Sequence, residues 1–306
     1  MLYTLTLNPS IDYAMEIGDI EIGATNYTKT EYMLPGGKGI NVSRVLSHLE
    51  VPNKAFGFIG GHTGKFIKDW LTEEQAVVDF VPVAGDTRIN VKLKGEHETE
   101  INGLGPVISE GEMGELLEKI EQLTEEDTLI ISGSKNRGIP EDFYLQIIEK
   151  LSKNGASFVI DTNSKELLEA LAYKPILVKP NQAELGDLFE VTIETEEDVI
   201  EYGQKLHEKG AQNVIISLGG DGAVFIDDEV IYKADSPKGE VVNTVGSGDS
   251  MIAGFMAGIT KGLSKKEAFE LGVQSGSATA FNQDLAKKED VYALNNQVKM
   301  RKVEKK

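Results

Sequence analysis

The 306-residue sequence contains no cysteine, few histidines, and far fewer basic than acidic residues. The absence of cysteine excludes disulfide bonds, thiolate catalysis and cysteine-ligated zinc. The four histidines are scattered and form no HExxH pattern, so no histidine metal site is indicated: His48, His62, His97 and His207. Fifty acidic against 31 basic residues give a formal net charge of −19, which disfavours nucleic acid and anionic membranes as partners.

Long apolar runs are also missing. No stretch approaches the ~20 residues of a membrane span. The opening residues, MLYTLTLNPS, lack the basic and apolar regions of a signal peptide. We therefore expect a cytoplasmic protein with no membrane partner. With 40% hydrophobic and 26% charged residues, the composition is that of a globular protein that can bury a sizeable core.

Short apolar segments alternate with amphipathic ones along most of the chain. The apolar segments predict strands at residues 2–7, 54–60, 128–133, 157–162, 176–181 and 213–220. The amphipathic segments predict helices at about 38–49, 62–74, 110–122, 140–152, 182–188 and 196–209. Capping-box spacing occurs at Ser109 with Glu112 and at Ser264 with Glu267.

This alternation predicts an α/β fold with a mainly parallel sheet that is covered by helices on both faces. In such folds the ligand binds beyond the carboxyl ends of the strands. Polar residues gather at those ends in this sequence: Asn8, Ser132, Asp161, Lys179, Asn181 and Ser217.

Two segments do not fit the alternation. Residues 11–34 and 87–102 read as strands with no helix after them, and INVKL and ETEIN flank a short Gly-containing turn typical of a β-hairpin. Because isolated two-stranded hairpins are marginally stable, we predict that both segments pair in one small β-sheet that forms a lid. The exposed edges of these strands further predict a homodimer in which the lids of two subunits pack together.

The segment NTVGSGDSMIAGF, residues 243–255, places a glycine-rich loop before an apolar helix. Gly246 and Gly248 allow close approach of the backbone, and the free N–H groups at the helix start form an anion site. Asp249 then has two interpretations. It is either a cap of the helix or a carboxylate that accepts a proton from a substrate hydroxyl beside the anion site. The surrounding glycines favour the second interpretation.

Three further motifs have both a structural and a functional interpretation. PGGKGIN (35–41) is either a tight turn with a solvated lysine or a second anion-binding loop around Lys38. KPNQAEL (179–185) is either a capped helix start or a site for hydrated magnesium, because Asn181 and Glu184 share one helix face. SLGGDG (217–222) is either a hairpin turn or a support for a purine or a phosphate.

In this order and spacing, GGKGINVSR (36–44), KPNQAEL and NTVGSGDSMIAGF resemble the ribokinase-like (PfkB) family of carbohydrate kinases over nearly the whole chain. The resemblance implies a single domain over residues 1–306, built as a three-layer α/β/α sandwich with lid insertions at about 11–34 and 87–102. TLTLNPSIDY, TRINVKL and ETEING are similar to the branch that phosphorylates sugar phosphates.

The implied reaction is transfer of the γ-phosphoryl group of ATP to a hydroxyl of a ketose phosphate, with fructose 1-phosphate as the expected acceptor. Tagatose 6-phosphate is the alternative acceptor, and a non-catalytic sugar-phosphate sensor is the alternative function. Retention of Asp249 and of both glycine loops disfavours the sensor. Arg88 disfavours a kinase for nucleosides or vitamins, because a neutral acceptor does not need a guanidinium group.

The resemblance also implies roles for individual residues. Asp249 would be the base, and the anion hole would comprise Gly246, Ser247 and Gly248. The sugar would be held by Asp12, Gly37, Lys38 and Asn41, and its existing phosphate by Arg88 and Asn90 together with Lys38. The ATP phosphates and Mg²⁺ would be organised by Lys179, Asn181 and Glu184. The nucleotide would be lined by Ser217, Gly219 and Gly222, and the adenine would lie by Asn282.

Two places depart from the family pattern. Asn243 stands where many members have Asp, at a position that helps to hold the loop or a monovalent cation, so dependence on such a cation stays open. Lys135, Asn136 and Arg137 stand near the expected substrate mouth, where relatives often have an apolar residue and proline. The pattern assigns these three residues no role.

Overall fold

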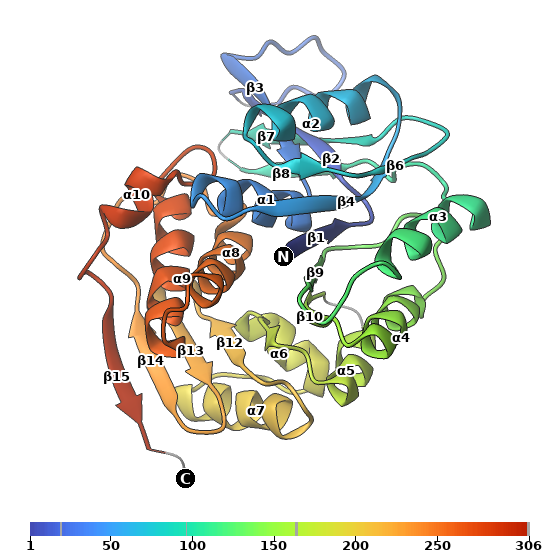
Figure 1. Cartoon of the computed structure of the whole chain (residues 1–306). Coiled ribbons are helices and arrows are strands. Elements are labelled where there is room, and N and C mark those ends of the chain that lie inside the picture. The colour runs from blue at the N-terminus through green and yellow to red at the C-terminus, as the bar shows by residue number, and fades with distance from the viewer. Residues whose placement is uncertain (19, 96, 163–164, 305–306) are drawn as a thin grey trace.

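The computed structural model describes residues 1–18, 20–95, 97–162 and 165–304, and two β-sheets dominate this part of the chain (Figure 1). The larger sheet has 11 strands in the order β15-β14-β13-β12-β11-β10-β9-β1-β4-β5, with β6 beside β4. Its parallel strands are β1 (Leu2–Thr6), β4 (Asn53–Ile59), β5 (Val77–Val78), β6 (Val81–Pro82), β9 (Thr128–Ser132), β10 (Ser157–Asp161), β11 (Leu177–Val178) and β12 (Val214–Ser217). Antiparallel strands extend it: β13 (Ala223–Ile226), β14 (Ile231–Asp235) and β15 (Lys299–Val303).

The central strands are buried on both faces. Ile130 and Ile131 of β9 are adjacent in sequence and point to opposite faces, yet both are fully buried, as are Val159 and Ile160 of β10. Continuous apolar runs of this kind are typical of parallel sheets that helices cover on both sides. The strand order reverses between β1 and β9, and this reversal opens a crevice at the carboxyl ends of the two strands.

Helices form the two outer layers of the sandwich. One face carries α1 (Lys38–His48), α8 (Ser247–Thr260), α9 (Lys265–Ala280) and α10 (Lys288–Tyr292), which share one apolar cluster. The other face carries α3 (Glu110–Ile120), α4 (Phe143–Asn154), α5 (Glu166–Ala170) with the 3₁₀ turn η1 (Leu171–Tyr173), α6 (Gln182–Phe189) and α7 (Glu196–Glu208). Between β4 and the lid lies α2 (Gly61–Glu73). The three-layer α/β/α sandwich is therefore confirmed.

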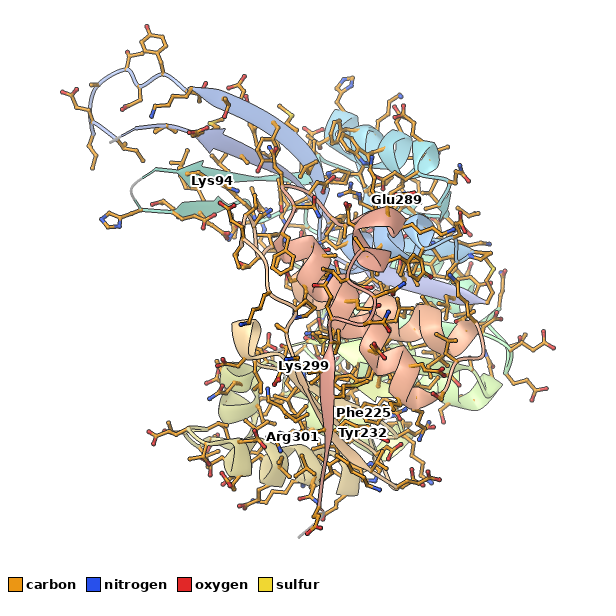
Figure 2. All side chains as sticks on the ribbon, turned by 90° about the vertical axis from the view of Figure 1, so that its left-hand side faces the viewer. Lys94, Phe225, Tyr232, Glu289, Lys299 and Arg301 are labelled. Carbon is orange, nitrogen blue, oxygen red and sulfur yellow. The ribbon has the colours of Figure 1, made fainter. Side chains whose placement is uncertain are left out.

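The two segments outside the α/β alternation pair into one sheet, as predicted. Its strands are β2 (Ser10–Glu16), β3 (Thr30–Gly36), β7 (Arg88–Lys94) and β8 (Thr99–Asn102), in the order β3-β2-β7-β8. β2 and β7 run parallel, whereas the outer pairs are antiparallel. Figure 2 shows this lid extending away from the body, with Lys94 on β7.

Most predicted element boundaries hold to within a few residues, and both predicted capping boxes are present. The strand expected at 176–181 shrinks to Leu177–Val178, because Pro180 has no N–H for a strand ladder and Asn181 already caps α6. The strand expected at 213–220 ends at Ser217, where the 3₁₀ turn η2 (Gly219–Asp221) leads back into the antiparallel β13. Within the described residues, no helix is long and apolar enough to cross a membrane.

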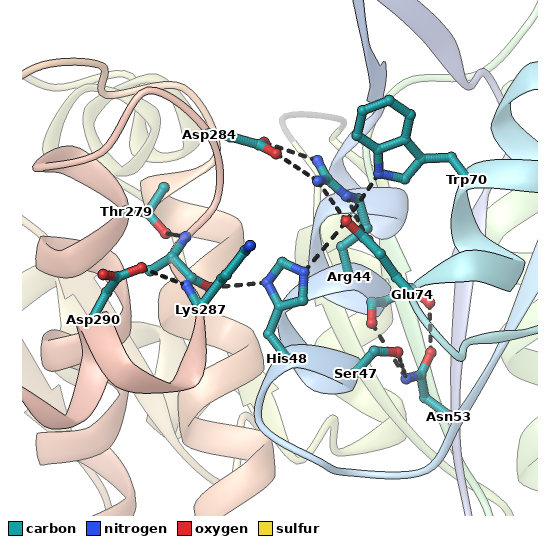
Figure 3. A network of polar contacts seen from close by, with 12 residues as sticks. Arg44, Ser47, His48, Asn53, Trp70, Glu74, Thr279, Asp284, Lys287 and Asp290 are labelled. Carbon is teal, nitrogen blue, oxygen red and sulfur yellow. Dashed lines mark hydrogen bonds and ion pairs between the residues drawn. The ribbon is translucent and has the colours of Figure 1, made fainter.

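A buried arginine joins three parts of the fold (Figure 3). Arg44 of α1 is 1% exposed. Its guanidinium donates two hydrogen bonds to Glu74 at the end of α2, both 2.8 Å, and two to Asp284 after α9, at 3.0 and 2.7 Å. Glu74 also accepts a hydrogen bond of 2.9 Å from the indole N–H of Trp70. The planar guanidinium of one arginine on α1 thus connects the loop after α9 to the end of α2 through hydrogen bonds.

The Glu74 carboxylate is expected to be a pH-dependent stabiliser. Burial alone would raise its pKa, but the bonds from His48 and Arg44 outweigh burial and lower the pKa to about 2 from 4.5. The ionised form is therefore favoured in the folded state, so its contribution is complete above about pH 4.5 and is lost as the pH falls toward about 2.

Glu74→Gln should lower the free energy of unfolding by about 3 kcal/mol near neutral pH, because it weakens the hold on a buried guanidinium. Urea unfolding measured across pH checks this, with the exposed neighbour Glu73→Gln as the control. A loss that stays constant down to about pH 3 would contradict the assignment.

Candidate active site

A cavity of about 1230 Å³ lies where the lid faces the carboxyl ends of the central strands. This volume exceeds the roughly 300–1,000 Å³ of a typical single-ligand pocket, so it has room for two substrates. All but one of the predicted site residues line it: Asp12, Gly37, Lys38, Asn41, Arg88, Asn90, Lys179, Asn181, Glu184, Ser217, Gly219, Gly222, Gly246, Ser247, Gly248 and Asp249. The exception is Asn282, whose amide donates to the Ala278 carbonyl at 2.8 Å and ends α9.

Unsatisfied polar atoms concentrate at this cavity. Nine buried side-chain nitrogen or oxygen atoms of the described residues have no hydrogen-bond partner. Five of them belong to lining residues, namely Thr6 Oγ1, Asn8 Oδ1, Arg88 Nε, Asn90 Oδ1 and Ser247 Oγ. Because buried polar groups in folded proteins are nearly always paired, this concentration indicates a site completed by polar ligands.

Asp249 is not a helix cap. It is the third residue of α8, the N-cap is Gly246, and no side chain caps this helix end. The Asp249 carboxylate is 6% exposed and accepts a hydrogen bond of 2.8 Å from the Asn41 amide of α1. The capping alternative is therefore excluded, and the carboxylate is held at the wall of the cavity.

Burial, together with the nearby carboxylate of Asp161, raises the pKa of Asp249 to about 6. Lys38, the Asn41 hydrogen bond and Lys179 act in the opposite direction but do not cancel the effect. A carboxylate with a pKa in this range is a stronger base than an exposed aspartate and is still ionised at neutral pH. These are the properties of a general base.

Asp161 at the end of β10 holds two lysines in place. Its carboxylate lies 3.1 Å from Lys38 Nζ and 3.7 Å from Lys179 Nζ, and it is 2% exposed. Burial would raise its pKa, but the ammonium groups of Lys179 and Lys38 keep it below the ordinary value. Sequence reasoning noted Asp161 only as one polar residue at a strand end. Its role depends on Lys38 and Lys179, which are far from it in the sequence.

The first turn of α8 has free N–H groups, as the prediction of an anion site requires, but one of the expected donors is already paired. The Ser247 N–H is already bonded to the Thr244 carbonyl at 3.2 Å, whereas the N–H groups of Gly248 and Asp249 can have no partner within the helix. The unpaired Ser247 hydroxyl adds a donor. A Cβ at position 248 would lie only 3.0 Å from Lys179 Nζ, so the ammonium group lies directly against the backbone of this turn.

Gly246 is required by two constraints. Its φ of 79° lies in the left-handed region, and an added Cβ would lie 2.5 Å from Leu285 Cδ2. Leu285 follows Asp284, the residue that Arg44 holds. The arginine network described above therefore supports the backbone turn that carries the anion site.

Arg88 brings a partly buried cation into the lid side of the cavity. Its guanidinium donates to the main-chain carbonyls of Gly103 at 3.2 Å and Asn8 at 3.0 Å, and Nε has no partner. Burial lowers its pKa, although a guanidinium remains charged in any protein. Among the described residues, no carboxylate lies within ion-pair distance of Arg88. This unneutralised charge favours an anionic ligand.

The cavity face of the lid is polar because side chains alternate along its strands. Arg88, Asn90 and Lys92 line the cavity from β7, with Asp12 beside them on β2. Asp12 Oδ1 accepts hydrogen bonds from Ser10 Oγ at 2.8 Å and from Asn90 Nδ2 at 3.0 Å. Four lining residues of the lid were missed from the sequence: Lys92, Ser10, Glu100 and Asn102. The alternation from Arg88 through Asn90 to Lys92 was the signal that pointed to the first of them.

Asn181 and Glu184 cap a helix, as the first interpretation of their motif predicts, and they leave one carboxylate oxygen for the second. They form a reciprocal capping box at the start of α6, with both hydrogen bonds at 2.8 Å. This uses Asn181 Oδ1 and Glu184 Oε2, whereas Glu184 Oε1 lies 3.7 Å from Lys38 Nζ beside the cavity. One cavity-facing carboxylate oxygen suits Mg²⁺, which keeps several waters and takes few protein ligands. Within the described residues, no group of three or more acidic or histidine side chains forms a full metal cage.

The two departures from the family pattern have structural roles. Asn243 donates to the Gln283 carbonyl at 3.0 Å and accepts from the Val245 N–H at 3.2 Å, so it fixes the loop before the anion site. Lys135 pairs with Glu166, and the side chains of Asn136 and Arg137 donate to carbonyls of the loop at 105–106. None of these four residues lines the cavity.

Comparisons with known proteins agree with this arrangement. The model of the pfkB family carbohydrate kinases matches residues 5–289. The chain is 48% identical to a 1-phosphofructokinase of Bacillus subtilis, and the match covers 98% of this chain and 99% of the relative. It is 41% identical to a D-tagatose-1-phosphate kinase of Bacillus licheniformis, and that match covers 93% of this chain and 94% of the relative. It is also similar to the crystal structure of phosphofructokinase-2 from Escherichia coli in complex with substrates and products, with a TM-score of 0.90, 32% identity, and coverage of 95% of this chain and 97% of that one.

The burial of Asp249 should cost stability. Because its folded pKa lies above the unfolded value of 3.8, the penalty for ionisation grows between about pH 4 and about pH 6 and is complete above that range. Asp249→Asn should therefore raise the free energy of unfolding by up to about 3 kcal/mol near pH 8, and the gain should vanish toward pH 4. Denaturant unfolding of both proteins across pH, with the exposed Asp187→Asn as control, measures this. Equal stability of variant and wild type at about pH 8 would mean that the carboxylate is not destabilised by burial.

Proposed function

Because this chain belongs to the PfkB family of carbohydrate kinases, we propose that it transfers the γ-phosphoryl group of ATP to a hydroxyl of fructose 1-phosphate. The observation that supports a phosphorylated acceptor is the partly buried guanidinium of Arg88 on the lid side of the cavity, which has no carboxylate at ion-pair distance among the described residues and whose Nε has no partner. The second candidate is a tagatose phosphate, supported by the name of the Bacillus licheniformis relative. A non-catalytic sensor is disfavoured, because a sensor has no need of a buried carboxylate with a raised pKa.

In the proposed reaction, the acceptor hydroxyl lies beside Asp249 and the first turn of α8. The hydroxyl oxygen forms a bond to the γ-phosphorus while the bond from that phosphorus to the β–γ bridging oxygen breaks, and ADP leaves with the electron pair. Asp249 accepts the hydroxyl proton. The amides of Gly248 and Asp249 and the ammonium groups of Lys38 and Lys179 stabilise the phosphoryl charge that shifts during the transfer.

Lys38 is assigned to the transferred phosphoryl group. The sequence suggested that it holds the acceptor's own phosphate, but its ammonium lies with Asp161 and Glu184.

Glu184 Oε1 would hold Mg²⁺ together with water and ATP phosphate oxygens, and the bound ion would neutralise phosphate charge. The nucleotide would lie over Ser217, Gly219 and Gly222. Cytoplasmic location remains a prediction. Dependence on a monovalent cation stays an open question, which turnover in K⁺ against Na⁺ tests.

We also propose a homodimer through the outer faces of two lids. Tyr13, Met33, Val91 and Ile101 lie in register across all four strands and form one apolar row on the face away from the cavity. Met33 is 41% and Ile101 59% exposed. A second copy offers the same row and can cover it by two-fold symmetry, as contiguous exposed apolar surface favours.

Asp249→Asn should lower kcat by roughly 10²–10⁴-fold, since it keeps the shape of the side chain and removes the base. In the wild type, kcat/KM should fall as the pH drops below about 6, where Asp249 becomes protonated. Coupled ADP release with fructose 1-phosphate measures both effects. Near-normal turnover of the variant would exclude Asp249 as the base.

Arg88→Ala should reduce kcat/KM for the phosphorylated ketose by roughly one to two decades per lost charge-assisted hydrogen bond and should leave the free ketose unaffected. Arg88→Lys should restore only part of the loss, because the two-pronged donor is gone. ADP release is compared for fructose 1-phosphate, fructose 6-phosphate, tagatose 6-phosphate and free fructose. Equal losses on free and phosphorylated sugars would contradict phosphate binding by Arg88.

Met33→Lys should shift the protein to a monomer at micromolar concentration, because a charge in the apolar row would be desolvated on association. Sedimentation velocity measures the state, and Leu263→Lys, in the exposed turn between α8 and α9, is the control. A wild type that sediments only as a monomer at this concentration would refute the dimer.

A further inference from the structure

Lys92 is a second lid cation whose position neither the motifs nor the proposed reaction explain. It lies on β7, two residues beyond Asn90 on the cavity face, and it is 9% exposed. Its ammonium group lies 3.5 Å from Asp12 Oδ2 and 3.5 Å from Glu100 Oε1. All three residues line the main cavity.

These ion pairs leave the ammonium group incompletely bonded. Charge-assisted N–H···O bonds are usually about 2.7–2.9 Å long, so a distance of 3.5 Å to each carboxylate leaves Lys92 between two partners without a short bond to either. An ammonium group has three donors. A ligand oxygen that reached Lys92 from the cavity would therefore gain a donor that the protein does not fully use.

Asp12 is asymmetric in the same way. Its Oδ1 accepts hydrogen bonds from both Ser10 and Asn90, whereas Oδ2 has only the long contact with Lys92. The bonds at Oδ1 fix the orientation of the carboxylate, and Oδ2 remains available as an acceptor. The lid thus presents to the cavity one fixed acceptor atom and, 3.5 Å from it, one cationic donor.

We propose that Asp12 Oδ2 and Lys92 Nζ together recognise two neighbouring hydroxyl groups of the acceptor, and that Lys92 makes the site selective for sugar configuration. One hydroxyl donates to Asp12, and its neighbour accepts from Lys92. Because the acceptor Asp12 Oδ2 and the donor Lys92 Nζ have fixed positions, they fit two adjacent hydroxyls in one relative configuration better than in the opposite configuration. Epimers that differ at one of these hydroxyls therefore bind unequally. This inference rests on the proposed function, in which the acceptor is a ketose phosphate.

The assignment separates two tasks that one cation cannot perform. Arg88 supplies charge for the acceptor's phosphate. It precedes Lys92 by four residues on β7, and in an extended strand this spacing puts the main-chain positions of the two residues about 13 Å apart. That separation is comparable with the length of a phosphorylated six-carbon ketose. The phosphate and the ring hydroxyls are therefore recognised at opposite ends of one row of side chains on β7.

The test uses the 1-phosphates of fructose, tagatose and psicose, which differ only in configuration at C3 or C4. Wild type should prefer one epimer by at least about tenfold in kcat/KM. Lys92→Met should lower kcat/KM for that epimer by roughly 10- to 100-fold, the effect of one charge-assisted hydrogen bond, and should bring the three values together. Lys92→Arg should retain part of the preference, and the KM for ATP should not change.

Lys94→Met is the matched control, since Lys94 lies on the same strand beyond the main cavity and contacts Tyr32. An equal loss on all three epimers, or no loss in Lys92→Met, would overturn the inference. If wild type phosphorylates none of the ketose phosphates, the proposed function fails instead. Calorimetric binding of the same three compounds to wild type and Lys92→Met would then still decide whether Lys92 distinguishes epimers.

Discussion

The site depends on the pairing of Asp161 with Lys38 and Lys179. These lysines approach from α1 and from the end of β11, and without a carboxylate between them the two neighbouring ammonium groups would repel each other. Asp161 also raises the pKa of Asp249, so the same carboxylate that gathers the cations strengthens the base. Moving Asp161 would therefore change cation placement and proton affinity together, and the order of β10, β11 and α8 in the fold fixes this arrangement.

Much of the support for the site comes from residues outside the cavity lining. Arg44 ties Asp284 to α1, Leu285 packs against Gly246, and Gly246 begins the turn that leads to Asp249. Asn41, one turn before Arg44 on the same helix, bonds Asp249 directly. A direct hydrogen bond from Asn41 and an indirect route of hydrogen bonds and packing from Arg44 thus connect α1 to the turn that carries Asp249. Buried Asp249 costs stability, and this scaffold offsets that cost.

Sequence patterns predicted the sheet, most helices, the pairing of the lid and a set of site residues of which all but Asn282 line the cavity, because these follow from local periodicity and from motifs. What they missed depends on distant contacts. Asp161 gains its role only beside Lys38 and Lys179, and Lys92 only beside Asp12 and Glu100. Asn282 does not line the cavity, and its amide bonds to the preceding turn of its own helix. The identity of the N–H donors in the anion site depended on the exact helix start, which sequence patterns locate least well.

The separation of lid from body has an evolutionary consequence. Recognition of the acceptor is assigned to side chains on β2 and β7, whereas proton transfer and phosphoryl binding are assigned to α8 and the ends of the central strands. Polar lid residues such as Asn90 and Lys92 belong to none of the three apolar clusters of the core. Substitutions there can alter which sugar is accepted while the folding core and the catalytic groups stay unchanged. New acceptor specificities can therefore arise in this architecture through a few lid mutations, without passing through an unfolded or inactive intermediate.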